Sequence, residues 1–214
     1  MMISEPIVTL TDYGLTVECA VLAWLMGRRA GGPAREWFTL FFLSLGAAAL
    51  TGGTVHGFFP DPTSVGHRLL WPTALLAIGV MAWAAWSAGG ALAFAPAAAR
   101  GISIAAGILF VVYAALVLLV SQDFAGAIIE YLPAALFLLV VFGWKAARSG
   151  IRGAWAGMAG LVLSFLAAAV QQLRFAPDPA RFDHNALYHV LQAVALILIY
   201  RGAAALVIPE THHG

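Results

Sequence analysis

Long apolar runs fill almost the whole chain and are separated by short stretches rich in charged residues, proline and glycine. A helix needs about 20 predominantly apolar residues to cross the hydrocarbon core of a bilayer. The runs therefore predict an all-α protein, an integral membrane bundle of seven transmembrane helices in one domain, residues 1–214. The predicted helices cover residues 8–28, 37–59, 67–89, 100–121, 124–147, 152–173 and 184–208.

Composition supports a membrane location. Hydrophobic residues make up 62% of the chain and charged residues 10%, whereas soluble domains carry about 25% charged residues. A soluble fold of this size has no interior large enough for so much apolar surface. The net charge of +1 also argues against a nucleic-acid partner, because such surfaces need clustered basic residues on a solvated face.

Basic residues predict the orientation of the bundle. Most of the eleven lysines and arginines fall in connections on one side of the seven spans, and basic loops favour the cytoplasm. We expect the N-terminus outside and the C-terminus in the cytoplasm. A single lysine among these basic residues, with abundant alanine and glycine, favours a bacterial cytoplasmic (inner) membrane. The basic residues on the predicted inner side are Arg28, Arg29, Arg35, Arg100, Lys145, Arg148, Arg152 and Arg201.

Polar side chains inside the predicted spans gather in the outer half. A polar or ionisable group within the bilayer is costly, so each one is a candidate functional residue. The inner half of every span is almost bare of ionisable residues. This asymmetry favours a pocket that opens on one side of the membrane. The outer-half residues are Asp12, Glu18, His56, His67, Asp123, Glu130, Gln171, Gln172, Asn185, His189 and Gln192.

The seventh predicted span carries the densest polar pattern. Asn185, His189 and Gln192 are spaced four and three residues apart, so they share one helical face that must point into the bundle. His184 lies around the helix from this stripe, in a first turn that Asp183 could cap. A single buried histidine most often only hydrogen-bonds a neighbouring helix. Several histidines at one depth favour a metal or cofactor site instead.

Zinc fits this combination of residues. A catalytic zinc site uses three protein ligands and a water whose pKa falls to near 7. His56, His67 and His189 can supply three imidazoles, and His184 or a carboxylate can be the fourth ligand or a supporting hydrogen-bond partner. Another divalent metal is an alternative.

Two carboxylates are candidate proton shuttles for such a site. Asp12 lies near the outer boundary of the first span, and Glu18 lies about 9 Å deeper. Asp12 is the better match in depth to the histidines, and Glu18 could instead be protonated and simply hydrogen-bonded.

The number of spans and the positions of the histidines resemble those of a known family of membrane proteins. Seven spans with an outward N-terminus, a histidine late in the second span (residues 50–58) and histidines early in the seventh are similar to the CREST superfamily of membrane hydrolases. That superfamily contains the alkaline ceramidases and the progestin/adipoQ receptors. The resemblance implies that His56 and His189 bind zinc and that the protein hydrolyses an amide bond of a lipid.

The chain departs from the family pattern at other positions. Gly52 stands where the family has serine, and His67 stands where it has aspartate. Asn185 stands where a helix-seven histidine is expected, with His184 one residue earlier. The resemblance therefore implies a rearranged ligand set and supports a zinc site more than a particular substrate.

The function predicted from the sequence is a zinc-dependent intramembrane hydrolase that cleaves an amide or ester bond of a lipid-like substrate. Its predicted partners are this substrate and membrane lipid. Two alternatives stay open. Histidines on facing helices could ligate a haem, or the ionisable residues could form the relay of a proton-coupled sensor or transporter.

Overall fold

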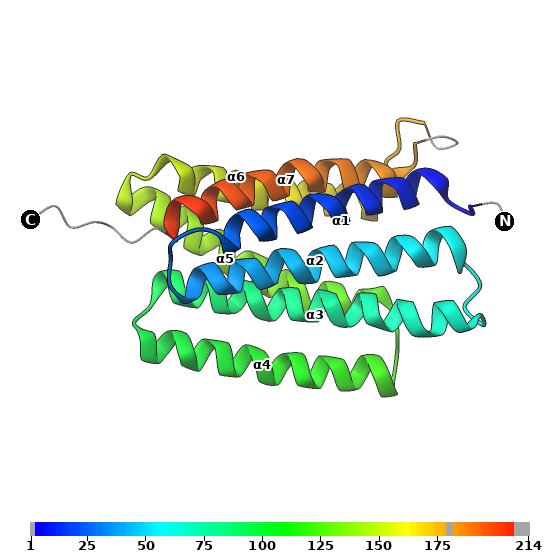
Figure 1. Ribbon diagram of the computed structural model, residues 1–214, viewed down its shortest axis with the longest axis horizontal. Coiled ribbons are helices and arrows are strands. Elements are labelled where there is room, and N and C mark those ends of the chain that lie inside the picture. The colour runs from blue at the N-terminus through cyan, green and yellow to red at the C-terminus, as the bar shows by residue number, and fades with distance from the viewer. Residues whose placement is uncertain (1–2, 179–181, 208–214) are drawn as a thin grey trace, which may run out of the picture.

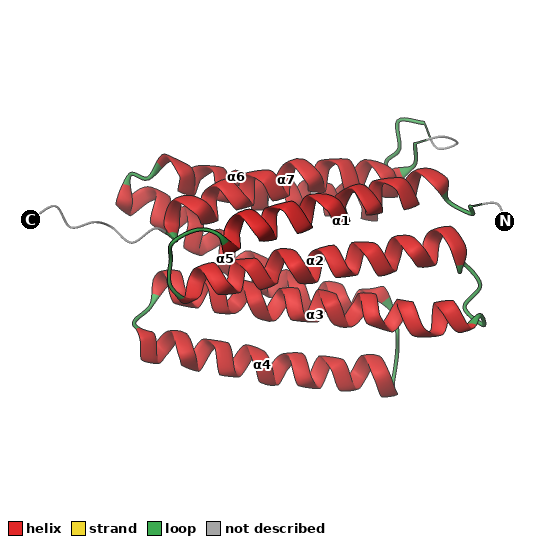
Figure 2. Ribbon diagram, in the orientation of Figure 1, coloured by secondary structure: helices red, strands yellow, loops and turns green. Residues whose placement is uncertain are grey.

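Every regular element is a helix in the part of the chain that the computed structural model describes, residues 3–178 and 182–207 (Figure 2). Seven helices in these ranges are each long and apolar enough to span a membrane. The prediction of an all-α, seven-helix fold is confirmed. The helices are α1 (Pro6–Gly27), α2 (Pro33–Phe58), α3 (Val65–Ala93), α4 (Pro96–Leu119), α5 (Phe124–Ser149), α6 (Arg152–Gln172) and α7 (His184–Leu206).

The helix boundaries differ from the predicted ones mainly where proline begins a helix. Helices α2 and α4 start at Pro33 and Pro96, four residues earlier than the apolar runs indicated. Proline is tolerated in a first turn because the missing N–H has no intrahelical partner there. Residue 208, the predicted end of the seventh helix, lies outside the described residues.

Aspartate caps the start of two helices, and a glycine ends one of them. The Asp123 carboxylate accepts a hydrogen bond from the backbone N–H of Ala125, and Asp183 accepts one from Ala186. Asp183 is thus the cap of α7 that the sequence indicated. Gly150 ends α5 at φ 65°, a left-handed conformation that glycine adopts without steric cost.

Six helices form a closed ring, and α4 lies outside it (Figure 1). Around the ring, α1 packs on α2, α2 on α3, α3 on α5, α5 on α6, α6 on α7, and α7 on α1. Helix α4 packs mainly on α3. It has the highest mean hydropathy of the seven helices, 2.7, and much of its surface is exposed, as expected for a helix that faces lipid.

Glycines on both helices allow close contact between α6 and α7. On α6, a side chain at Gly160 would meet the backbone oxygen of Ala195 at 2.6 Å and the backbone nitrogen of Ile199 at 2.8 Å. On α7, a side chain at Gly202 would collide with the backbone of Gly157. Small residues at these points let the two backbones approach closely, as is common between helices in membranes.

The two ends of the bundle are held differently. We call the end at which α1, α3, α5 and α7 begin the N end, and the opposite end the C end. At the C end, the Arg29 guanidinium donates to the Tyr200 hydroxyl at 3.2 Å and to the carbonyl of Ala204 at 3.3 Å, which joins the end of α1 to α7. At the N end, the Asp61 carboxylate accepts hydrogen bonds from the N–H and hydroxyl of Thr63, and these bonds lower its pKa.

Candidate functional site

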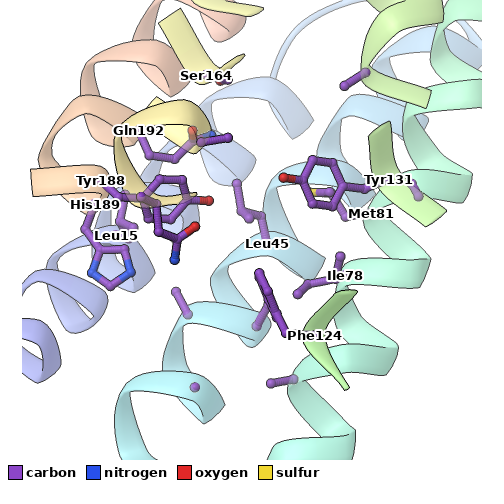
Figure 3. A pocket seen from close by; sticks show the side chains of 18 of the residues that line it. Leu15, Leu45, Ile78, Met81, Phe124, Tyr131, Ser164, Tyr188, His189 and Gln192 are labelled. Carbon is purple, nitrogen blue, oxygen red and sulfur yellow. The ribbon is translucent and has the colours of Figure 1, made fainter. Parts of the chain in front are cut away.

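A cavity of about 340 Å³ lies inside the ring. All six ring helices line it, and α4 does not. Its polar lining residues come mostly from the N-end half of each helix, while its deeper wall is apolar. Figure 3 shows His189, Tyr188 and Gln192 together on one side of the cavity. The apolar lining includes Leu45, Met81, Ala85, Leu138, Leu161 and Ile199. The size is within the usual range for small-molecule sites, and the polarity is arranged for an amphipathic occupant.

Asp12 and His189 form the most buried polar pair on the cavity wall. Asp12 Oδ1 lies 3.2 Å from His189 Nε2, and the two side chains are only 8% and 9% exposed. Both residues line the cavity. Asp12 lies on the second turn of α1 and His189 on the second turn of α7, so the depth match expected for these two residues is confirmed.

Thr11 holds the other side of the histidine ring. Its hydroxyl lies 2.9 Å from His189 Nδ1 and also close to the carbonyls of Ile7 and Val8. Both ring nitrogens of His189 therefore have a protein partner. Asp12 has a second carboxylate oxygen, so it is the member of the pair that is better placed to meet a ligand.

Gly53 allows Asp12 to take this position. An added side chain at Gly53 would meet the Asp12 Cβ at 2.5 Å and its Oδ2 at 3.2 Å. One turn further toward the N end, a side chain at Gly57 would meet the Thr9 hydroxyl at 2.7 Å. Helix α1 is thus pressed against α2 at two glycines, and this contact aims Asp12 between α2 and α7.

A second pair lies nearer the N end. His56 follows Gly53 by three residues on α2, and its Nδ1 lies 3.2 Å from Glu5 Oε2. These side chains are 35% and 44% exposed, far more than the inner pair. His56 also lines the cavity. It packs edge-on against Trp71, with ring centroids 6.5 Å apart.

Trp71 organises the N-end side of the cavity. Its ring lies 6.0 Å from the His67 ring and 6.2 Å from the Phe124 ring. Its indole N–H donates to the carbonyl of Gln122, which links α3 to the connection before α5. Trp71 and Phe124 line the cavity, so aromatic surface covers part of its N end.

The polar stripe predicted on the seventh helix faces the cavity, as expected. Asn185, His189 and Gln192 all line it. The Gln171 amide of α6 donates to Asn185 Oδ1 at 3.2 Å and ties the two helices together at that level. Tyr188 and Tyr131 add hydroxyl groups that point into the cavity from opposite walls (Figure 3).

The other predicted site residues lie apart from this group. The His67 ring nitrogen Nδ1 is bonded to the carbonyl of Phe59, and neither His67 nor His184 lines the cavity. Glu18 is also absent from the cavity wall, and its Oε1 is buried without a hydrogen-bond partner. Of the four histidines, the structure brings His56 and His189 to one cavity.

In the described part of the chain, the four histidines predicted as zinc ligands do not come together. Both ring nitrogens of His189 face a protein group, Asp12 Oδ1 and the Thr11 hydroxyl, and His56 lies nearer the N end with its Nδ1 beside Glu5. Within residues 3–178 and 182–207, no three histidine, cysteine or acidic side chains come together in a group able to hold a metal ion. Three protein ligands are the usual minimum for catalytic zinc.

Several residues of the cavity wall and its surroundings were not predicted from the sequence, among them Glu5, Thr11, Tyr131, Ser164 and Tyr188. Glu5 lies before the first helix, and Thr11 and Tyr131 are common residues in membrane helices. The available signal for Thr11 was its position beside Asp12. Glu5 becomes recognisable only when the helices are assembled, because its partner His56 is distant in sequence. Tyr131 becomes recognisable only when its helix is placed against the cavity.

Comparison with known proteins identifies one matching family. Residues 7–207 match a family of unknown function, DUF6962. No curated protein and no solved structure matches the chain significantly.

The contrast in burial between the two pairs gives a stability prediction. Replacing Asp12 by alanine leaves a buried imidazole without its partner and should cost about 3 kcal/mol of unfolding free energy. Replacing Glu5 by alanine breaks a half-exposed pair and should cost no more than about 1 kcal/mol. Reversible unfolding in mixed micelles measures both values. Equal losses in the two variants would contradict the assignment of the inner pair.

Proposed function

Since this chain belongs to the DUF6962 family, whose function is unknown, its cavity must be interpreted from its own chemistry, and we propose that the protein binds an amphipathic, lipid-like molecule inside the helical ring. The polar part of that molecule lies at the Asp12–His189 pair. Its apolar part occupies the deeper wall toward the C end.

The graded lining of the cavity is the observation that carries this proposal. Hydrocarbon chains are stabilised by apolar walls, and polar head groups need hydrogen-bonding partners where water is excluded. The cavity offers both, in separate halves, within one continuous space. No lysine or arginine lines it, so the polar half suits an uncharged or cationic group better than an anionic one.

A direct binding test uses dodecan-1-ol as the probe. Gly52 lines the cavity, and an added Cβ there meets no atom within 4 Å. Gly52→Leu should therefore place a leucine side chain in space that the apolar part of the probe occupies. The probe then loses apolar contact with the cavity wall, and binding of the tritiated probe should weaken at least about tenfold.

Gly14→Leu is the matched control. Gly14 is also free of neighbours within 4 Å, but it is exposed on α1 and does not line the cavity. Binding is measured on protein in lipid nanodiscs, with empty nanodiscs subtracted. Equal affinities for the probe in the wild type and in Gly52→Leu would exclude the cavity as its binding site.

The proposal includes an orientation in a bacterial cytoplasmic membrane. The basic residues concentrate at the C end, including Arg28, Arg29, Arg35 and Arg100, and the positive-inside rule favours the cytoplasm for that end. The cavity's polar half then faces outward, the N-terminus lies outside and the C-terminus lies inside.

Thiol labelling tests the orientation in intact cells. In a Cys19→Ala background, a membrane-impermeant maleimide should label Asp61→Cys, which lies in an N-end turn, and should not label Arg100→Cys near the C end. The reverse pattern would show the opposite orientation.

Hydrolysis of an amide or ester in the bound molecule is a second candidate function. It is favoured by the side-by-side placement of Asp12 and His189 on the cavity wall. In this candidate, Asp12 accepts a proton from the water that attacks the carbonyl carbon and returns it to the alcohol or amine as the ester or amide bond breaks, while His189 holds the carboxylate in place and Thr11 orients the imidazole ring. General acid–base groups of this kind contribute about 10²–10⁴-fold to rates.

The hydrolase candidate predicts fatty-acid release from a long-chain ester by purified protein. Asp12→Asn should lower that rate at least about 100-fold, while Glu36→Gln, an exposed change at the C end, should leave it unchanged. Absence of fatty-acid release from the wild type would exclude this candidate and leave lipid binding intact.

Metal analysis of the same preparation distinguishes a zinc-dependent hydrolase from one in which Asp12 acts without a metal. The arrangement of His56, His189 and their acidic neighbours favours less than one zinc per chain. One zinc per chain in the wild type, lost in both His56→Ala and His189→Ala, would instead support the zinc hydrolase and the CREST relationship that the sequence indicates. Haem binding and proton-coupled transport stay alternatives, which no side-chain arrangement in the described part of the chain favours.

A further inference from the structure

The wall formed by α6 and α7 carries polar groups at two depths. Gln171 and Ser164 are seven residues apart on α6, and Asn185 and Gln192 are seven residues apart on α7. The two helices run in opposite directions, so Gln171 meets Asn185, and Ser164 reaches the depth of Gln192. Each step is about 10 Å along the helix axis. All four residues line the cavity.

The two levels differ in how their polar groups are satisfied. At the level nearer the N end, Gln171 and Asn185 are hydrogen-bonded to each other at 3.2 Å. At the deeper level, Ser164 Oγ is buried and has no hydrogen-bond partner among the described residues. Figure 3 shows Ser164 and Gln192 on the same side of the cavity.

Ser164 differs in this respect from other hydroxyl residues within the helices. A serine or threonine in a membrane helix commonly donates to the carbonyl four residues earlier, which satisfies its hydroxyl without a partner on another helix. Thr9, Thr16, Thr39, Ser44, Thr51, Thr54 and Thr73 all make this bond. Ser164 does not, although Gly160 offers the equivalent carbonyl.

A buried hydroxyl without a partner costs free energy, about 1–3 kcal/mol by mutational data. That cost is removed when a ligand group supplies the partner. The hydroxyl can donate and accept, as can the Gln192 amide. A ligand hydroxyl, which also donates and accepts, complements both groups.

The depth of this level relates it to the Asp12–His189 pair. Gln192 follows His189 by three residues, so it lies about 5 Å deeper along α7. We propose that Ser164 and Gln192 form a second polar subsite, which binds a hydroxyl group on the chain of the amphipathic ligand about 5 Å beyond its head group. This inference rests on the proposed lipid-binding function and specifies the class of lipid.

Two probes that differ by one hydroxyl test the subsite. Dodecan-1-ol carries only the head hydroxyl, and dodecane-1,5-diol carries a second hydroxyl four bonds further along the chain. The wild-type protein in nanodiscs should bind the diol about fivefold more tightly, which corresponds to one net hydrogen bond.

Substitutions locate the effect. Ser164→Ala should abolish the preference for the diol and leave the affinity for dodecan-1-ol unchanged, and Gln192→Leu should weaken the preference as an independent check. Ser44→Ala is the matched control, because Ser44 donates to the carbonyls of Leu40 and Phe41 and does not line the cavity. It should keep the preference.

The outcomes separate the subsite from the function on which it depends. Equal binding of the two probes by the wild type overturns the subsite and leaves lipid binding in place. A preference that persists in both Ser164→Ala and Gln192→Leu also overturns it. Failure of the wild type to bind either probe overturns the subsite together with the proposed lipid-binding function.

Discussion

A hydrocarbon environment offers no hydrogen-bond partners, and this constraint governs most of the structure. Backbone groups are satisfied within helices, because a spanning segment has no other way to pair them in lipid. Most hydroxyl side chains bond to their own helix for the same reason. Polar groups that cannot do so are turned inward, and the ring of six helices gives them a shared interior.

Close helix contacts determine where those inward groups meet. Gly53 and Gly57 bring α1 against α2, so Asp12 is held where it can reach α7. Gly160 and Gly202 bring α6 against α7, which places the Gln171–Asn185 hydrogen bond and Ser164 on one wall. The chemistry of the cavity thus depends on residues that have no side chain. A methyl group at Gly53 would act on Asp12 without any contact with a ligand.

The arrangement of the cavity also distinguishes the candidate functions. Its polar and apolar halves are separate, which suits a molecule with a head and a chain better than a path for ions across the membrane. His56 and His189 both reach the cavity, but each is paired with a different acid, Glu5 or Asp12. Two histidines that line one cavity therefore need not share one ligand, because each has its own acidic neighbour.

The sequence by itself determined the number and type of the helices, the cap at Asp183 and the inward face of Asn185, His189 and Gln192. These features depend on the spacing of residues along one helix, which the sequence displays directly. The tertiary structure alone decided that Asp12 pairs with His189, that His56 pairs with Glu5, and that Ser164 stays without a partner. Such pairings depend on the rotation and separation of different helices, and those are set by contacts between distant segments, as at Gly53 and Gly160.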